Sequence, residues 1–287
     1  MTNSQEISPK RIQEIIELAE VVASEYGVQG SLSPAQIIQD NKIGFCYGRY
    51  KHHFDGMLTY FEGRFFIYCN LDKVQAKDSP RARFTLCHEL GHFFIDEHRR
   101  VLMRGENLHH PSQCDFSSKL LVEQEADLFA SYLLMPSFAF DELAGRKKAH
   151  KGIEEVLFLK NHFQTSITST ALRYVKSNVT PCAMFIWNTD QSLKWHWKSD
   201  VFFSNYLGKP VANCLHLGRT SATIQAFSSD EIRSSGSTIA TFFENVPAND
   251  KRNCILIEES LRLGEFGILT LVYPDGQSIS FDDFASK

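Results

Sequence analysis

The sequence lacks the features of membrane and secreted proteins. No hydrophobic run approaches the roughly 18 residues that a membrane span requires. Residues Met1 to Lys10 are polar, without the apolar centre of a signal peptide. The seven cysteines are odd in number and include no CxxC pair, which argues against a disulfide framework and against a second zinc site. We therefore expect a cytoplasmic protein with reduced cysteines.

An excess of positive charge is also missing. The formal net charge is −4, so the overall charge does not attract nucleic acid. What is present is an ordinary globular composition, with 43% hydrophobic and 22% charged residues. The length of 287 residues allows about two domains.

The most informative segment is the pentapeptide His-Glu-Leu-Gly-His at residues 88–92. A serine and a proline at the preceding helix start predict a helix over residues 81–95, with the pentapeptide inside it. Side chains four positions apart share one face of a helix, so we expect His88 and His92 to bind one metal ion. Glu89 is then the expected general base that takes a proton from the attacking water. This arrangement is typical of zinc peptidases.

A catalytic zinc site needs a third protein ligand if one coordination position is to stay open, and two residues compete for this role. His98 lies ten positions after His88, which is the spacing of the third histidine in metzincins. That pattern also needs a glycine where this chain has Ile95, and no convincing Met-turn follows. Glu123 begins a second predicted helix. We favour Glu123 over His98, in a site that holds one Zn²⁺ per chain.

The second predicted helix carries two more acidic residues. Asp127 lies four positions after Glu123 on the same helical face, so we expect it to accept a hydrogen bond from a ligand histidine and fix its tautomer. Glu125 lies only two positions after Glu123 and is expected to point into solvent.

Two segments near the metal helix have predicted roles of their own. Residues 57–61 and 64–69 flank Glu-Gly and predict a β-hairpin, whose edge is a candidate for binding an extended substrate. The alternative is a purely structural hairpin. Residues 99–118 predict a long loop and a candidate lid, in which His109 and His110 are expected to be solvated rather than to bind metal.

The pattern changes after residue 145, where a charged run at residues 145–151 predicts a solvated linker. Two helices follow, over 153–162 and 167–176, with the spacing of a helix-turn-helix. We favour packing of this pair on the peptidase over DNA contact, because the second helix offers only Arg173 and Lys176 as bases. Five strands are then predicted at residues 183–187, 192–197, 238–243, 254–258 and 267–273.

Two blocks of sequence resemble the ImmA/IrrE family of bacterial metallopeptidases. They are Arg-Phe-Thr-Leu-Cys-His-Glu-Leu-Gly-His at 83–92 and Glu-Gln-Glu-Ala-Asp-Leu-Phe-Ala-Ser-Tyr-Leu-Leu-Met-Pro at 123–136. In that family the first Glu of the second block is the third zinc ligand, and an Asn or Asp four residues later supports the site. The resemblance covers roughly residues 8–180. One departure is Cys87, where the family usually has alanine, and we interpret it as packing rather than as a rival thiolate.

The resemblance and the patterns together imply an α+β protein in three parts. These are a zincin-like, gluzincin-type peptidase domain with a small β-sheet (1–145), a helix-turn-helix-like segment (146–179) and a C-terminal α+β, GAF-like sensor domain (180–287).

The resemblance further implies a zinc-dependent endopeptidase that cleaves a separate XRE-type repressor and thereby releases stress-response or mobile-element genes. Two other classes stay open. One is a DNA-binding regulator that uses residues 153–176, and the other is a non-catalytic binding module with a structural zinc.

Overall fold

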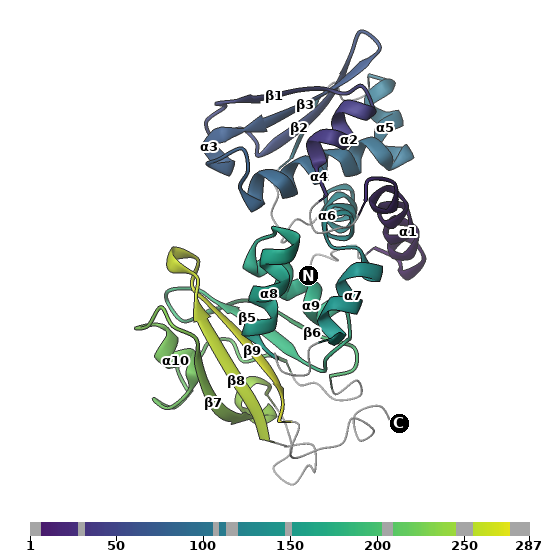
Figure 1. Cartoon of the computed structure of the whole chain (residues 1–287). Coiled ribbons are helices and arrows are strands. Elements are labelled where there is room, and N and C mark those ends of the chain that lie inside the picture. Colours follow the sequence, from purple (N-terminus) through teal and green to yellow (C-terminus); the bar gives the residue numbers. More distant parts are fainter. Residues whose placement is uncertain are drawn as a thin grey trace. The chain divides into compact units, whose positions relative to one another are not determined.

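The computed structural model describes residues 7–27, 32–105, 109–112, 120–146, 151–202, 209–244 and 255–275. The chain divides into two compact units (Figure 1). The N-terminal unit comprises Met1–Phe140 and Lys160–Ser166, and the C-terminal unit comprises Asp141–Leu159 and Ile167–Lys287. None of the described helices is both long and apolar enough to span a membrane. The predicted boundaries at residues 145 and 179 stay predictions.

The N-terminal unit combines helices with one small sheet. Its elements are α1 (Pro9–Glu25), α2 (Pro34–Asp40), β1 (Gly44–Gly48), β2 (Gly56–Phe61), β3 (Arg64–Asn70), α3 (Leu71–Val74), α4 (Pro80–Phe94), α5 (Asp96–Met103), β4 (His109–Ser112) and α6 (Leu121–Leu134). Helix α7 (Ser137–Arg146) follows α6, and its first residues belong to this unit.

Serine caps start three of these helices in the same way. Ser8, Ser33 and Ser79 each precede a proline, and each side chain accepts a hydrogen bond from a backbone N–H of the first turn. Proline suits the first helical position because its missing N–H has no partner there, and its fixed φ matches the helix. The predicted helix over residues 81–95 is thereby confirmed as α4.

The sheet of the N-terminal unit has the strand order β1-β3-β2-β4. Strands β2 and β3 form the predicted hairpin, and both residues of its turn, Glu62 and Gly63, have positive φ. Strand β1 pairs with β3 in parallel, while β4 pairs with β2 in antiparallel orientation, with Gly56 opposite Ser112. Both hairpin strands therefore have neighbours on both sides.

The structure decides between the two alternatives for the hairpin and corrects the prediction for residues 99–118. The hairpin does not offer a free edge, because β4 occupies the edge of β2. The segment 99–118 is not a continuous loop, since α5 continues to Met103 and residues 109–112 form β4. The side chains of His109 and His110, for which we predicted solvation, lie outside the described residues, as do 106–108 and 113–119.

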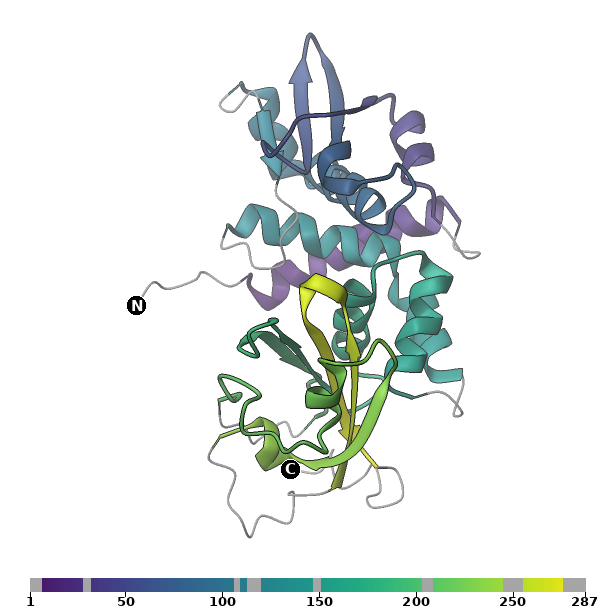
Figure 2. The ribbon, with the colours of Figure 1, turned by 90° about the vertical axis from the view of Figure 1, so that its left-hand side faces the viewer.

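The C-terminal unit is built on a five-stranded antiparallel sheet with the order β6-β5-β9-β8-β7. The long pair β8–β9 is visible in yellow in Figure 2. The strands and helices are α8 (Ile153–Phe163, of which Ile153–Leu159 belong to this unit), α9 (Ile167–Lys176), β5 (Ala183–Trp187), β6 (Leu193–Lys198), α10 (Ala222–Ala226), β7 (Arg233–Thr238), α11 (Ile239–Phe242), β8 (Ile255–Arg262) and β9 (Ile268–Pro274).

Four of the five predicted C-terminal strands are confirmed as β5, β6, β8 and β9. The fifth, over 238–243, was wrong, because residues 239–242 form helix α11 and the strand is β7. Thr238 and Thr241 make a reciprocal capping box, which favours a helix start over continued strand. Strand β7 escaped prediction because its sequence, Arg-Ser-Ser-Gly-Ser-Thr, has no apolar alternation.

Four aromatic side chains pack together in the core of the C-terminal unit. The rings of Phe185 and Trp187 stack with centroids 5.6 Å apart, and Phe242 and Phe243 pack against Phe185. All four residues are buried. The α+β class is confirmed, whereas the GAF-like assignment stays a prediction.

Candidate metal centre

Three ligand-type side chains of the N-terminal unit converge on one point. Helix α4 supplies His88 and His92, whose Nε2 atoms are 3.1 Å apart. Helix α6 supplies Glu123, whose carboxylate oxygens lie 3.3 Å from Nε2 of His88 and 3.6 Å from Nε2 of His92. All three residues are buried, and together they form a group able to hold one metal ion.

A close crossing of α4 and α6 brings these side chains together. A Cβ atom at Gly91 would lie only 3.1 Å from Cα of Ala126 and 3.3 Å from Cβ of Phe129. Glycine on one helix and alanine on the other therefore let the two backbones approach. Because Gly91 directly precedes His92, this close crossing determines the distances from the Glu123 carboxylate to the imidazoles of both histidines.

The donor set fits zinc in chemistry and in spacing. Two imidazoles and one carboxylate are a known ligand set for catalytic zinc, which leaves a fourth position open. Ligand atoms bound at their usual distances in a tetrahedral site are about 3.3 Å apart, and the observed separations run from 3.1 to 3.6 Å. A buried carboxylate such as Glu123 also needs a nearby cation or other partner to offset its desolvation.

Asp127 orients His88 from the far side of the imidazole ring. Its Oδ1 lies 2.8 Å from Nδ1 of His88, so an Nδ1–H that donates to Asp127 leaves the Nε2 lone pair directed at the centre. Burial lowers the pKa of His88, but hydrogen bonds to Asp127 and Glu123 outweigh it and raise the pKa to about 10. Protons and a metal ion therefore compete for the same nitrogen.

Glu89 is completely buried beside the centre, between α4 and strand β2. A Cβ atom at Gly56 would lie 2.5 Å from Oε1 of Glu89 and 2.6 Å from Cγ2 of Thr85, so β2 passes directly over this carboxylate. Burial raises the pKa of Glu89 to about 8. A carboxylate with a raised pKa is a stronger base than one in water, which suits proton transfer near neutral pH.

Gly56→Ala should therefore damage the site without removing any ligand. The added methyl group would overlap Oε1 of Glu89 and force β2 or the carboxylate to move. We expect a destabilisation of about 1–3 kcal/mol, together with a loss of any proton transfer by Glu89 at unchanged metal content. Thermal unfolding and zinc analysis test this result, with Gly63→Asn in the exposed hairpin turn as the control. Wild-type activity of a folded Gly56→Ala protein would contradict the close approach.

His98, the alternative ligand, lies next to the centre without facing it. Its Nδ1 is 3.1 Å from Nδ1 of His92, the ring nitrogen opposite to the one that points at Glu123. The expectation that Glu125 is solvated was wrong, since its side chain is only 13% exposed and bonds to His98 and Arg11. Glu125 faces the neighbouring helices α1 and α5 rather than solvent.

Two further residues near the centre have clear placements. Burial raises the pKa of Cys87 to about 12, so its thiol stays protonated, as expected for a packing residue. Ser112 on β4 escaped sequence analysis, and its Oγ lies 3.4 Å from Nε2 of His92. Only the pairing of β4 with β2 brings Ser112 to the site, so no local sequence pattern indicates it.

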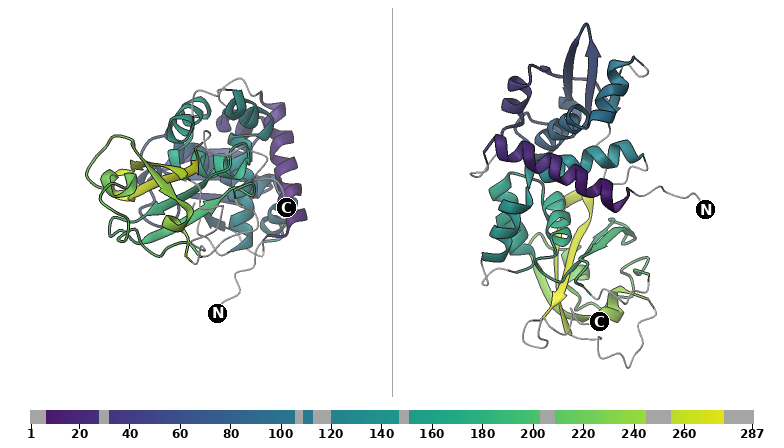
Figure 3. Two further views of the ribbon diagram at one scale, coloured as in Figure 1. Left: turned by 90° about the horizontal axis from the view of Figure 1, so that it is seen from below. Right: turned by 90° about the vertical axis from the view of Figure 1, so that its right-hand side faces the viewer.

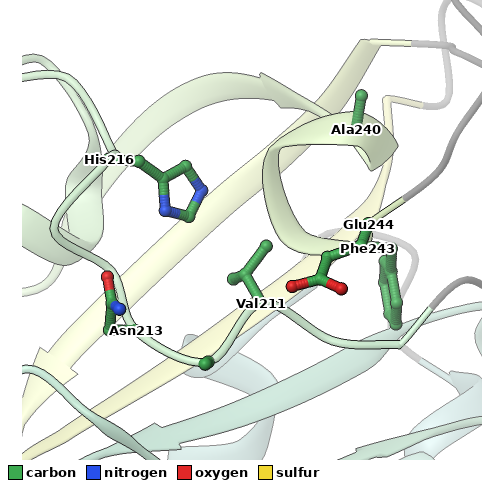
Figure 4. A pocket seen from close by; sticks show the side chains of 7 residues that line it. Val211, Asn213, His216, Ala240, Phe243 and Glu244 are labelled. Atoms are coloured by element: carbon green, nitrogen blue, oxygen red, sulfur yellow. The ribbon is translucent and has the colours of Figure 1, made fainter.

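The C-terminal unit has a separate hollow of about 530 Å³ between the segment 211–216 and helix α11 (Figure 4). Val211 and Phe243 line it together with His216 and Glu244. Nε2 of His216 lies 3.0 Å from the carbonyl oxygen of Thr241 on α11.

The chain is similar to solved structures and to one known protein family. Among solved structures, a Mycobacterium tuberculosis transcriptional regulator is similar at 12% identity and a TM-score of 0.58, over 92% of this chain and 78% of that chain. At this identity the likeness concerns the fold alone. No curated protein matches the chain. Residues 74–174, which include α4 and α6, match the peptidase M78 family model. The chain therefore carries an IrrE N-terminal-like domain, which confirms the predicted resemblance to the ImmA/IrrE family.

Proposed function

We propose that this protein is a zinc-dependent endopeptidase with one Zn²⁺ per chain. The observation that carries the proposal is the convergence of His88, His92 and Glu123 beside the buried carboxylate of Glu89. A purely structural zinc site has four protein ligands, whereas this group offers three and keeps a general base next to them. The peptidase family match over the same residues supports this interpretation.

The roles of the protein groups follow from their positions. Bound zinc would supply Lewis-acid chemistry, by activating water and polarising the scissile carbonyl. Glu89 takes a proton from the attacking water at its carboxylate and later delivers it to the leaving amine. Asp127 keeps His88 in the tautomer whose Nε2 is free to bind the ion.

Strand β4 is the proposed docking edge for the substrate. It pairs with β2 along one edge, and within the described part of the chain no strand pairs with its other edge. An extended peptide that adds to this edge would run past Ser112, which lies beside His92. Backbone pairing would then hold the scissile bond at the centre, independently of most side chains of the substrate.

The proposed substrate is a separate repressor with an XRE-type helix-turn-helix, whose cleavage in the bacterial cytoplasm releases stress-response or mobile-element genes. The ImmA/IrrE resemblance supports this choice, and one protein with a similar solved structure is itself a transcriptional regulator. The C-terminal unit would sense the signal or position the repressor.

The proposal is tested with the zinc-loaded protein and the XRE-type repressor encoded nearest to its gene. We expect discrete fragments by mass spectrometry, lost after chelation and restored by added Zn²⁺. A zinc peptidase of another family is the control for nonspecific cleavage, and it should not produce the same fragments of the repressor. An intact repressor under all these conditions, together with intact test peptides, would contradict the endopeptidase function.

The alternative of a DNA-binding regulator is weakened by the second helix of the pair, α9. Its Arg173 is 2% exposed, and the guanidinium lies 3.7 Å from the carboxylate of Asp141 within the C-terminal unit. Only Lys176 of the two expected bases is exposed, and one base is too few to hold a helix in the major groove.

A further inference from the structure

We propose that His98, Glu125 and Arg11 form a positioning chain that holds the metal-binding histidine His92 in its working orientation. This inference rests on the proposed zinc function. It assigns His98 the role of a support for a ligand, in place of the role of an alternative ligand. It also connects the N-terminal helix α1 to the metal centre.

The chain of contacts is continuous from the centre to α1. Nδ1 of His92 lies 3.1 Å from Nδ1 of His98, and Nε2 of His98 lies 3.0 Å from Oε2 of Glu125. Glu125 accepts two hydrogen bonds from Arg11, from Nε at 3.0 Å and from a terminal nitrogen at 2.9 Å. The links are mostly withdrawn from water, since the side chains of His98, Glu125 and Arg11 are 7%, 13% and 24% exposed.

These contacts fix the direction of every hydrogen bond when His92 binds metal. Nε2 of His92 must then offer its lone pair to the ion, so its proton sits on Nδ1 and donates to Nδ1 of His98. His98 consequently carries its own proton on Nε2 and donates it to the carboxylate of Glu125. Two neutral imidazoles and one carboxylate thus complete the sequence of donors and acceptors without a mismatch.

Arg11 closes the chain by fixing the carboxylate that receives the last proton. A bidentate pair between a guanidinium and a carboxylate restricts the orientation of both groups. Hydrogen bonding to Glu125 raises the pKa of Arg11 further above its ordinary value, so the guanidinium stays charged. Arg11 sits on α1, which packs against α6, the helix of Glu125 and Glu123 (Figure 3).

The two ligand histidines are therefore supported differently. Asp127 contacts His88 directly, with 2.8 Å between Oδ1 and Nδ1, whereas His92 reaches its carboxylate only through the imidazole of His98. Helices α1, α5 and α6 all contribute residues to the positioning chain behind His92. Displacement of α1 would loosen His92, although α1 provides no ligand.

The test measures Zn²⁺ affinity by competition with a chromophoric chelator, and the visible absorption of the Co²⁺-loaded protein. The variants are His98→Leu, His98→Gln and Arg11→Met. We expect His98→Leu to weaken binding by about 10- to 100-fold, which is typical for lost support of a metal ligand. His98→Gln keeps one acceptor and one donor, so it should recover part of this loss. The Co²⁺ absorption should shift in His98→Leu because His92 is free to rotate.

Arg11→Met distinguishes an effect of the hydrogen bonds in the positioning chain from a general effect of side-chain packing. The substitution keeps a long apolar stem on α1 but removes the hydrogen bonds to Glu125, so a weaker loss of affinity in the same direction is expected. Glu97→Gln is the matched control, because Glu97 also accepts a hydrogen bond from Arg11 but is 68% exposed and lies outside the positioning chain. The Zn²⁺ affinity of Glu97→Gln should equal that of the wild type. Circular dichroism and thermal unfolding of the metal-free proteins verify that each variant folds.

The outcomes distinguish this inference from the proposed function. A wild-type protein that binds no Zn²⁺ would overturn both. A wild-type protein that binds Zn²⁺, with equal affinity in folded His98→Leu and Arg11→Met, would overturn the positioning chain alone. His98→Gln as weak as His98→Leu would also contradict it, because volume rather than hydrogen bonding would then matter. If His98→Leu does not fold, Arg11→Met decides the question.

Discussion

Glu89→Gln should retain one zinc ion per chain but lose nearly all peptidase activity. Glutamine fills the buried space between α4 and β2 that Glu89 occupies, and His88, His92 and Glu123 are unaffected. The neutral amide cannot accept a proton from the attacking water. General acid–base catalysis contributes about 10²- to 10⁴-fold, so we expect a fall of this size in kcat/KM. Removal of a buried group with a raised pKa should not reduce the stability of the metal-free protein.

The measurement combines zinc analysis with cleavage of the repressor or of a labelled peptide. Glu62→Gln, in the exposed turn between β2 and β3, makes the same chemical change away from the centre and should be fully active. If a zinc-loaded Glu89→Gln protein cleaves at the wild-type rate, Glu89 is not the general base. If neither the wild type nor the variant cleaves, and chelation unfolds both, the zinc is structural and the protein is a binding module.

Local sequence rules were sufficient for the metal helix. A serine cap, a proline at the first helical position and two histidines four residues apart are all short-range features, and α4 contains them as predicted. The spacing of Glu123 and Asp127 is also local to α6, and the structure brings both side chains to His88. Helical periodicity alone places His88 and His92 on one face of α4, and Glu123 and Asp127 on one face of α6.

Pairing between distant segments was not predictable in the same way. Strand β4 contains two histidines, a proline and a serine, with no apolar alternation, and it exists because β2 offers an edge that it can pair with. Ser112 therefore reaches His92 through a contact that no local pattern encodes. Glu125 was expected in solvent because it lies only two positions after Glu123. Its partner Arg11 lies on α1, far away in the sequence, so no local pattern indicates their contact.

Glu123→Ala should abolish zinc binding at concentrations where the wild type is saturated. The alanine removes one of three protein ligands and leaves the two Nε2 atoms of His88 and His92 as the only donors in the group. Loss of a direct ligand should reduce affinity by more than the roughly 100-fold upper range for supporting residues. His98→Leu, by contrast, should keep stoichiometric zinc at high metal concentration. Cleavage should disappear with the metal in Glu123→Ala.

Zinc content after equilibrium dialysis at a series of zinc concentrations, up to a large excess, checks this order of effects. Glu17→Ala, on the exposed face of α1, is the control for loss of a helical glutamate and should match the wild type. The expected ranking reflects geometry, because the Glu123 carboxylate lies within 3.3–3.6 Å of both Nε2 atoms, while His98 contacts His92 at the opposite ring nitrogen. Full zinc in Glu123→Ala and none in His98→Leu would reverse the assignment and restore the metzincin-like alternative.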